Sequence, residues 1–570
     1  MPPAPSTPPV DLQLDWDNTW VGADCFDRID HHFLIGRLLR LTGEVALRSK
    51  PTRALDVAAA EGIHTADLAL AGIDAIAIDP SPAMLQASRE EMAQRGTRFG
   101  LVRGIAETMP FRDAVFDGIL CHGAIDHTAD PALAVREMAR VLAPDGRLVI
   151  SGVNYEGLTA RVSRLVYRVA RRLGWVAAST TLYWDSPVPA EHSFECSYWR
   201  LRQLCEPYLE FDGAVGVSLG VGLPGWGRVL ARLGEHRALR VLRPLDALAA
   251  RSPRFADFVY TMWRPRPRAA WPVLRLPSDG GFAVQPDDVT YPYKVAGECA
   301  HWAKSEFEGG QFLRGAVAQR LLNEAHTGQP DRTWLDDLLA RGPFGDAAVL
   351  GCDEERFDRR WLERGGSRTL DVYDLSAEVI GTVRRRLGPL AARVRFVQTD
   401  LNFAELPAAR YDVIWSSGCL HHVVNLEHLL AQVERALRPG GLLALQDYVG
   451  ERRLQFSAAR LARINAILHA VPPRWRRHGV ERIEPPHTSV LSPFCAVRPE
   501  ALLPLAAARF DLVSRRFAGS LFPLDIHLDL DAIARADPAL LGRIEQAAGE
   551  AARDPATPPP GVYAVFRKRS

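Results

Sequence analysis

The stretch RALDVAAAEGIHT, at residues 53–65, decides how the first part of this chain folds. Residues 53–57 form a short apolar run, which is typical of a buried parallel strand, and Asp56 lies near the end of that run. The turn that follows holds three alanines and a single glycine, Gly62, whereas nucleotide-binding turns are usually rich in glycine. A strand that leads directly into such a turn predicts an α/β fold with a ligand site at the turn.

The chain contains an internal repeat. The stretch VFDGILCHGAIDHTADPALAVREMARVLAPDGRLVIS (115–151) matches RYDVIWSSGCLHHVVNLEHLLAQVERALRPGGLLALQ (410–446) at one constant offset. The matching pairs are Asp79 and Asp374, Asp117 and Asp412, His127 and His422, Arg140 and Arg435, and Gly146 and Gly441. Such a register over two long stretches predicts two copies of one domain in tandem.

Each half alternates apolar runs with segments of helical spacing. In the first half, DAIAID is a strand, SPAMLQASREEMAQRG a helix ending at Gly96, FDGILCHG a strand, PALAVREMARVLAPDG a helix and GRLVISGVN a strand. This order predicts an α/β protein with two doubly wound, Rossmann-like domains, each a parallel sheet covered by helices on both faces. The expected boundaries are a tail at 1–20, a first domain at 21–267, a proline-rich linker at 268–285 and a second domain at 286–570.

The composition is that of an ordinary globular protein. The 570 residues are 47% hydrophobic and 24% charged, and the net charge of +1 argues against a nucleic-acid partner. The eight cysteines form no C-x-x-C pair, which argues against a structural zinc site and suits a reducing compartment. We found neither a leader nor an apolar run long enough to span a membrane, so the expected location is the cytoplasm.

The residues at the strand ends indicate which cofactor the first half takes. In such sheets ligands bind at the carboxyl ends of the strands, and Asp79, which ends the second strand, can accept hydrogen bonds from a ribose. Methyl groups at Ala58 and Ala60 obstruct the close backbone approach that a pyrophosphate needs. The alanines therefore argue against NAD and are compatible with S-adenosylmethionine, whose carboxylate can face the amides of the next helix.

With these motifs in place, residues 53–153 resemble the class I S-adenosylmethionine-dependent methyltransferases of the small-molecule type. The resemblance implies that the turn at 58–62 flanks the methionine part of the cofactor, that Asp56 binds its amino group and that Asp79 holds the ribose. It places Ala106 and Glu107 beside the adenine. The implied cofactor-binding residues are Asp56, Ala58, Ala60, Gly62, Asp79, Pro80, Ala106, Glu107 and His122, with no metal ligand. The family favours glycine at positions 58 and 60 and often has an acidic residue where Ile105 stands.

The second half resembles another branch of the same superfamily, one often associated with sugar and polysaccharide biosynthesis. Its turn reads AVLGCDEERF, so that Asp353 and Glu355 stand where glycines belong and Val349 replaces the acid at the strand end. Two carboxylates would repel the cofactor's carboxylate. We therefore expect a degenerate copy that serves substrate binding, formation of a homodimer, or packing.

Two histidines are candidates for catalysis. A hydroxyl acceptor benefits from a base, and His127, in the loop after the fourth strand, is placed to face the methyl group. His192 opens the segment that often closes the acceptor pocket in this family. The alternative for His127 is a residue that only packs or caps the next helix.

An insertion at 155–190 is expected to form the lid of the acceptor pocket. Its helix, at about 158–175, has an apolar stripe and a basic remainder, which suits either a membrane-surface helix or an ordinary cap with a solvated basic face. The near-neutral charge of the chain favours the cap.

The resemblance implies methyl transfer from S-adenosylmethionine by the first domain, with O-methylation of a sugar, glycolipid or secondary metabolite as the expected reaction. The alternatives are two successive methylations by both halves, or a non-catalytic scaffold in which both sites have decayed. An oxidoreductase would need a pyrophosphate loop, and a nucleic-acid methyltransferase would need a basic groove.

Overall fold

The computed structural model describes residues 28–177, 184, 192–272, 282–304, 315–352, 356–486 and 491–569. The chain divides into two compact units. One comprises the described residues of Val10–Leu274 together with Asp287–Tyr293, and the other those of Arg275–Pro286 and Lys294–Ser570. The tail predicted at 1–20, part of the predicted linker, and residues 178–183 and 185–190 of the insertion predicted at 155–190 lie outside the described residues.

The first unit is built on a seven-stranded sheet of order β3-β2-β1-β4-β5-β7-β6. The first five strands in this order run parallel, whereas β7 is antiparallel to both β5 and β6. The sheet is therefore parallel, as predicted, except at this edge, where β7 makes it mixed. The strands are β1 (Arg53–Val57), β2 (Asp74–Asp79), β3 (Gly100–Arg103), β4 (Phe116–His122), β5 (Leu142–Val153), β6 (Leu209–Val217) and β7 (Phe258–Pro265).

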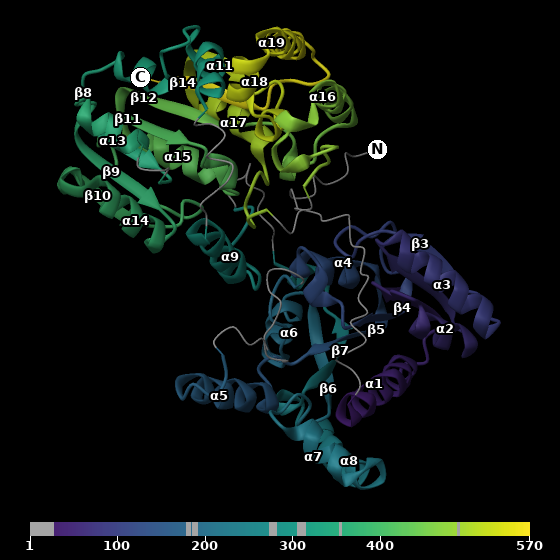
Figure 1. The fold of residues 1–570 in the computed structure, drawn as a ribbon. Helices are drawn as coiled ribbons and strands as arrows, with labels where there is room; N and C mark the ends of the chain where they lie inside the picture. Colours follow the sequence, from purple (N-terminus) through teal and green to yellow (C-terminus); the bar gives the residue numbers. More distant parts are fainter. Residues whose placement is uncertain are drawn as a thin grey trace. The chain divides into compact units, whose positions relative to one another are not determined.

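Helices cover both faces of this sheet (Figure 1). They are α1 (Ile29–Leu47), α2 (Ile63–Leu70), α3 (Pro82–Arg95), α4 (Pro131–Val141), α5 (Leu158–Arg172), α6 (Tyr198–Cys205), α7 (Trp226–Leu233) and α8 (Glu235–Arg251). Gly96 caps α3 in the left-handed conformation, as the sequence predicts. Helix α4 ends at Val141, because the chain enters β5 at Leu142. The helix is therefore shorter than the sequence predicts, since Pro144 and Gly146, the expected end, already belong to β5.

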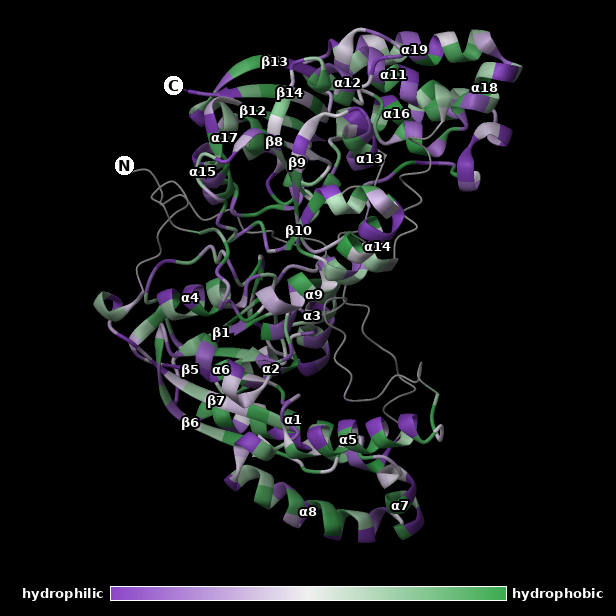
Figure 2. Cartoon of the chain, turned by 90° about the vertical axis from the view of Figure 1, so that its left-hand side faces the viewer, coloured by the Kyte–Doolittle hydropathy of each residue, from purple (hydrophilic) through white to green (hydrophobic). Residues whose placement is uncertain are grey.

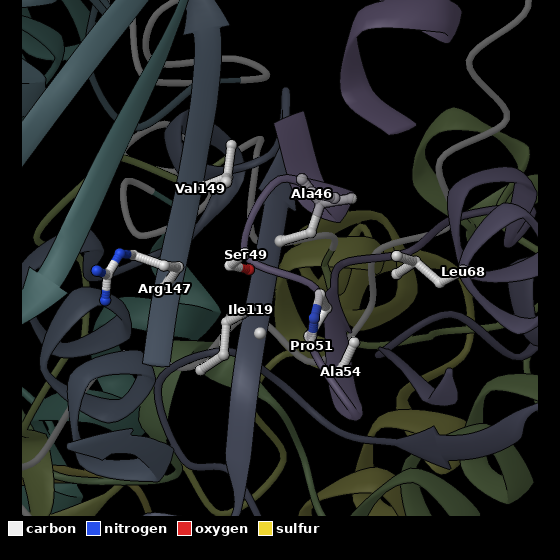
Figure 3. A pocket seen from close by; sticks show the side chains of 10 residues that line it. Ala46, Ser49, Pro51, Ala54, Leu68, Ile119, Arg147 and Val149 are labelled. Atoms are coloured by element: carbon white, nitrogen blue, oxygen red, sulfur yellow. The ribbon is translucent and has the colours of Figure 1, made fainter. Parts of the chain in front are cut away.

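One glycine of β4 is required by close packing of the strand against the chain entering β1. A Cβ atom at Gly118 would lie 2.7 Å from the Cβ of Pro51. A small, mostly apolar space remains beside this contact, bordered by Pro51, Ala54 and Ile119 (Figure 3). With a volume of about 10 Å³ it admits no ligand, so it is a packing space and not a site.

The second unit repeats the same topology, with the strand order β10-β9-β8-β11-β12-β14-β13. Its penultimate strand, β14, is again antiparallel to both neighbours. The strands are β8 (Phe344–Leu350), β9 (Ser367–Asp374), β10 (Val394–Gln398), β11 (Tyr411–Ser417), β12 (Leu437–Tyr448), β13 (Phe510–Ala518) and β14 (Gly561–Lys568). The prediction of two Rossmann-like domains in tandem is confirmed.

Helix α9 (Tyr291–Lys304) begins in the segment assigned to the first unit and continues into the second. The remaining helices are α11 (Ala316–Thr327), α12 (Trp334–Leu339), α13 (Arg356–Glu363), α14 (Ala377–Leu387), α15 (Leu426–Ala436), α16 (Ala458–Ala470), α17 (Leu502–Arg509), α18 (Leu530–Ala536) and α19 (Pro538–Ala552).

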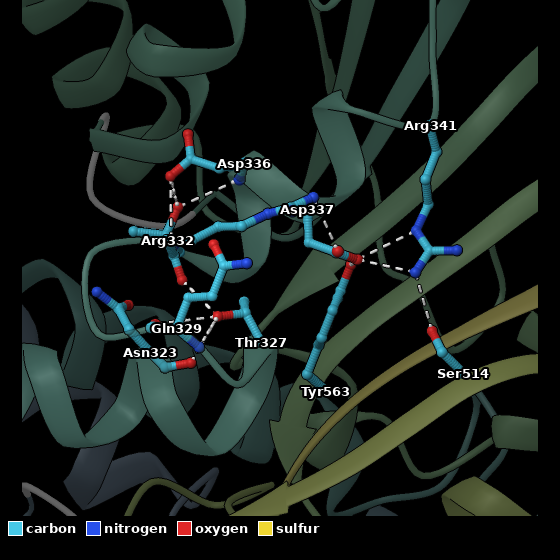
Figure 4. Close-up of polar contacts among 10 residues, drawn as sticks. Asn323, Thr327, Gln329, Arg332, Asp336, Asp337, Arg341, Ser514 and Tyr563 are labelled. Carbon is cyan, nitrogen blue, oxygen red and sulfur yellow. Dashed lines mark hydrogen bonds and ion pairs between the residues drawn. The ribbon is translucent and has the colours of Figure 1, made fainter.

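Helix α12 is tied to the antiparallel edge of the second sheet through one carboxylate. Asp337 accepts hydrogen bonds from the Tyr563 hydroxyl of β14 at 3.0 Å and from the Arg341 guanidinium at 2.8 Å (Figure 4). Arg341 also donates to the Ser514 hydroxyl of β13 at 3.1 Å. This network fixes the helix that leads into β8.

Two of the residues repeated between the halves hold the fold and not the site. Asp117 accepts the backbone N–H groups of Thr52 and Arg53, just before and within β1. Asp412 does the same for Gly345 and Asp346 in β8. The carboxylate thus anchors the first strand of each sheet.

Candidate functional site

The first unit has a cavity of about 160 Å³ at the carboxyl ends of β1, β2 and β4. Eight residues predicted for the site lie in its lining, which consists of Ala58, Ala60, Asp79, Pro80, Ser81, Met84, Ile105, Ala106, Glu107, His122, Gly123, Ala124, His127, Thr128 and Ala129. Spacing within strands and turns could not identify Ser81, Met84, Gly123, Ala124, Thr128 or Ala129, because these residues reach the cavity only through the folding of the segments that follow β2 and β4.

The alanine-rich turn keeps a backbone conformation that glycine normally supplies. Ala58 has φ = 54° and Ala60 has φ = 48°, both in the left-handed region. The backbone is held there from outside, because the Ala60 carbonyl accepts the Ser88 hydroxyl of α3 at 2.9 Å. The turn has therefore lost its glycines without losing its shape.

The Asp79 carboxylate closes this turn. One oxygen accepts the Ala60 N–H at 3.0 Å and the other accepts the Ser81 N–H at 2.9 Å. Burial raises the pKa of Asp79, and the two N–H donors oppose that rise. Because Asp79 lines the cavity and each of its oxygens has further acceptor capacity, it can also accept hydrogen bonds from hydroxyl groups of a ligand.

Glu107 and His122 border the cavity from two other loops. Glu107 accepts the backbone N–H groups of Ala129 and Asp130 at 2.8 and 3.2 Å, so it fixes the loop ahead of α4, and burial raises its pKa. The Nδ1 atom of His122 lies 2.8 Å from the Ser151 hydroxyl. Burial, together with the nearby His64, lowers the pKa of His122 to about 3, so this imidazole stays neutral and does not serve as a base near neutral pH.

His127 and His192 lie next to each other. Their ring centroids are 4.6 Å apart in an edge-to-face arrangement. The Nδ1 atom of His192 lies 3.8 Å from an oxygen of the buried Asp126 carboxylate. Of the two histidines, only His127 contributes to the lining of the cavity.

Asp56 and Gly62 are placed behind the cavity and not in its lining. The Asp56 carboxylate is buried and accepts the Thr65 hydroxyl of α2 at 2.7 Å, and burial raises its pKa to about 7. A Cβ atom at Gly62 would lie 2.9 Å from atoms of Phe99 and Ser88, so glycine is needed there for packing. Both residues shape the turn from within the protein.

The second unit holds its corresponding turn in the same way. Asp374, at the end of β9, accepts the Cys352 N–H and the Ser376 N–H, each at 2.7 Å. Burial raises the pKa of Asp374, as it does for Asp79. Asp353 and Glu355, the two acids expected to repel a cofactor, lie outside the described residues.

Helix α5 of the insertion differs from the predicted cap. Its apolar side chains are exposed, and its buried residues are the small Thr159, Ala160 and Ser163. Arg164 turns inward and donates to the backbone carbonyls of Tyr155 and Trp184. The helix therefore packs on the domain through small side chains, and the apolar stripe expected to be its packing face is exposed.

Comparison with known families agrees with the geometry. The sequence profile of a family described as "Methyltransferase domain" matches residues 55–150 and again residues 349–445. These ranges run from within β1 to within β5 and from within β8 to within β12, and the first range contains every residue that lines the cavity. The chain carries two methyltransferase domains in tandem.

Among curated proteins, the chain is similar to a trans-aconitate 2-methyltransferase of Azoarcus sp. The two are 34% identical over 151 residues, which is 24% of this chain and 58% of the relative. A demethylmenaquinone methyltransferase of Mycobacterium marinum is 37% identical over 115 residues, covering 20% of this chain and 47% of the relative. The chain thus spans about half the length of the curated relatives it matches.

Among solved structures, the chain is similar to an S-adenosylmethionine-dependent methyltransferase of Thermotoga maritima, described as a possible histamine N-methyltransferase. The match has 20% identity and a TM-score of 0.25, and it covers 41% of this chain and 92% of that one.

Proposed function

We propose that the first methyltransferase domain binds S-adenosylmethionine in the cavity at β1, β2 and β4 and transfers its methyl group to an oxygen of a small molecule. The observation that carries the proposal is the cavity itself, whose lining unites the Asp79 carboxylate, Glu107 and His127. Its place at the carboxyl ends of parallel strands is where ligands of such sheets bind.

The residues of the cavity suit this cofactor. Asp79 would accept hydrogen bonds from the two ribose hydroxyls, since each of its oxygens has used one acceptor position on a backbone N–H. The exposed turn at Ala60 presents a methyl group, which tolerates a ligand without phosphates better than one with a pyrophosphate. The apolar Ile105 and Ala106 would face the adenine ring.

The bound cofactor supplies a methyl group that is already activated on a sulfonium. What remains for the protein is to orient an acceptor oxygen, exclude water and take up the acceptor's proton. His127 lines the cavity and is the candidate for that base, and His192, whose ring edge contacts it, would orient it. His122 is excluded from this role by its low pKa.

The cofactor is tested by calorimetric titration of S-adenosylmethionine and its demethylated product into the full chain and into a matched pair of variants. Asp79→Ala and Asp374→Ala each remove a carboxylate with the same two backbone contacts. We expect binding to be lost in Asp79→Ala and kept in Asp374→Ala. Binding that depends on Asp374 would mean that the second domain also takes the cofactor and would favour two successive methylations. If the folded full chain binds neither ligand, the enzyme proposal fails and a non-catalytic scaffold replaces it.

The reaction is tested with hydroxylated acceptors of the sugar, glycolipid and phenolic secondary-metabolite classes, by following formation of the demethylated cofactor. We expect His127→Gln to lower kcat by about 100-fold or more while cofactor affinity is unchanged, since a base acts on the acceptor. His192→Gln should cause a smaller loss and shift the pH profile. A His127→Gln enzyme with unchanged kcat would contradict the role of base.

A further inference from the structure

A cluster of metal-ligating side chains lies in the second domain, apart from the cavity described above. His421 and His422 end the short 3₁₀-helix Leu420–His422 after β11, and Cys495 comes from the segment ahead of α17. One ligand atom from each of these three residues lies within 4.8 Å of the other two. Cys495 lies far in sequence from the two adjacent histidines, so the absence of a C-x-x-C pair could neither reveal nor exclude the cluster.

Each histidine of the cluster is oriented by a carboxylate. The Nδ1 atom of His421 lies 2.6 Å from Asp447, and the Nδ1 atom of His422 lies 2.8 Å from Glu298. With Nδ1 engaged, Nε2 of each ring is the atom left to ligate. A carboxylate that accepts the far N–H of a histidine is the arrangement usual around protein-bound metal ions.

The two carboxylates are themselves held in place. Asp447 accepts the Leu420 N–H at 2.8 Å, so it fixes the turn that carries both histidines. Glu298, on α9, accepts the Trp302 indole N–H at 2.8 Å and the Phe494 N–H at 2.9 Å, next to Cys495. The same group therefore orients His422 and positions the segment that carries the thiol.

The backbone around Cys495 is fixed from a second direction. The Arg453 guanidinium donates to the carbonyls of Ser492, Pro493 and Cys495 at 3.0 to 3.2 Å. The Arg453 N–H donates to the Ala496 carbonyl at 2.7 Å. The thiol is thus presented by a restrained segment, and its side chain, like those of the two histidines, is only partly buried.

We propose that His421, His422 and Cys495 bind one zinc-class divalent cation, with the fourth coordination position open to an exogenous ligand. Two imidazole nitrogens and one thiolate are ligands that zinc prefers, and three protein ligands are typical of zinc sites that also bind a small molecule. His422 occupies the position that His127 has in the first domain, so the ion would lie where a methyl acceptor is bound in that copy. The expected fourth ligand is a thiol, a hydroxyl or a small anion.

The test loads the metal-free full chain with Zn²⁺ and, as a spectroscopic probe, with Co²⁺. We expect a single high-affinity site and, with Co²⁺, a thiolate-to-metal charge-transfer band. Cys495→Ser should abolish the band, whereas Cys299→Ser, a thiol on α9 outside the cluster, should leave it unchanged. Asp447→Asn should weaken Zn²⁺ binding by about 10 to 100-fold, because it orients a ligand without touching the ion.

The proposal is overturned if the folded, metal-free chain takes up no stoichiometric Zn²⁺, or if the Co²⁺ band persists in Cys495→Ser. The cluster would then serve only to hold the turn after β11 against the segment that carries Cys495. Circular dichroism of each metal-free variant separates loss of the site from loss of the fold. None of these outcomes depends on cofactor binding by the first domain, so the two proposals fail independently.

A second inference rests on the exposed side of α5. The exposed apolar side chains are Leu158 (50%), Val162 (39%), Leu165 (56%), Val166 (44%), Val169 (46%), Leu173 (55%) and Trp175 (76%). The helix also carries five arginines and no acidic residue; Arg164 turns inward and pairs with Glu195, whereas Arg161, Arg168 and Arg172 are exposed. The whole chain has a net charge of only +1, so the positive charge of this helix is a local feature of the molecule.

The neighbouring hairpin of α7 and α8 extends this basic, apolar end of the first domain. The loop before α7 is bonded to α5, since Gly220 N–H donates to the Thr159 hydroxyl at 2.9 Å. Val229 of α7 and Leu248 of α8 are exposed, at 45% and 54%. Figures 1 and 2 both show α5, α7 and α8 at the same end of this domain, and Figure 2 shows apolar and polar residues alternating along α5.

We infer that this end of the first domain docks on an anionic lipid bilayer. An apolar helix face flanked by arginines is typical of helices that lie in the membrane interface, and anionic headgroups complement the arginines. None of the described helices has the length and apolar character that a membrane crossing requires, so the contact would be peripheral.

Co-sedimentation of the full chain with lipid vesicles tests the surface. We expect binding to vesicles that contain phosphatidylglycerol, little binding to pure phosphatidylcholine, and release by salt. The double substitution Leu165→Gln and Val169→Gln should reduce the bound fraction at least tenfold, while Leu512→Gln, an equally exposed residue of β13, should not. The inference fails if binding to anionic vesicles is absent or unaffected by the double substitution, or if the double substitution instead dissociates an oligomer, which would make the face an interface between copies.

Discussion

The alanine turn of the first domain stores backbone strain that a single substitution can release. Ala60 has φ = 48° and its methyl group is exposed. An L-residue in the left-handed region costs about 1–2 kcal/mol, whereas glycine adopts it freely but loses about 0.5–1 kcal/mol more conformational entropy on folding. Ala60→Gly should therefore stabilise the domain by about 0.5–1 kcal/mol.

The neighbouring Ala58 gives a smaller effect. Its φ of 54° carries similar strain, but its methyl group is partly buried against the core of the first sheet. Burying one methylene is worth about 0.8 kcal/mol, so its removal offsets much of the gain. We expect Ala58→Gly to change stability by less than about 0.5 kcal/mol.

Differential scanning calorimetry of the full chain measures both variants. For a domain of this size, about 1 kcal/mol shifts Tm by about 2–4 °C, so Ala60→Gly should raise the transition of the first domain by about 1–4 °C. Ala114→Gly, at φ = 55° in a turn outside the cavity, should give a similar gain. Ala93→Gly, at an exposed position in the last turn of α3, should cost up to about 1 kcal/mol. A lower Tm for Ala60→Gly would refute the assignment of strain to this turn.

Three further predictions test the packing around the two sheets. Burial raises the pKa of Asp56 from 3.8 to about 7, so the folded state binds this proton more tightly than the unfolded state does. The free energy of unfolding should therefore fall as pH rises from about 4 to 7. Urea unfolding of Asp56→Asn should lack this part of the decline. Gly118→Ala should cost about 1–3 kcal/mol in thermal unfolding because its Cβ would collide with Pro51, whereas Gly43→Ala, which has open space on α1, should be neutral or stabilising. Tyr563→Phe should cost about 1 kcal/mol in urea unfolding through loss of its hydrogen bond to α12, and an unchanged midpoint would show that the bond contributes nothing.

The tandem fold could be predicted from the sequence because the positions repeated between the two halves include residues that anchor the strands. Asp117 and Asp412 anchor β1 and β8 by the same backbone contacts, so their spacing reports the architecture directly. Part of the cavity could be predicted as well, because the apolar runs of β2 and β4 locate the strand ends at which Asp79 and His122 lie. The inward turn of Asp56 was not predictable, because it depends on Thr65 of α2.

Features that depend on contacts between distant segments could not be read from local patterns. The apolar stripe of α5 has the spacing of a packing face, yet Thr159 and Ser163 face the domain because the loop at Gly220 comes close to the helix. Likewise, Cys495 meets His421 only through the segment that Arg453 and Glu298 hold.

The comparison of the two domains shows that an acidic residue at the end of the second strand does not by itself indicate a cofactor site. Asp79 and Asp374 each bind two backbone N–H groups of the turns around them, so either carboxylate would be needed for the shape of its turn even if no cofactor were bound. What differs between the copies is the next loop, where the first domain places His127 at its cavity and the second joins His422 to His421, Cys495 and Glu298. We therefore predict that this loop sets the function of each copy, because an acid retained at the strand end is compatible both with the methyl-transfer site proposed in one domain and with the metal site proposed in the other.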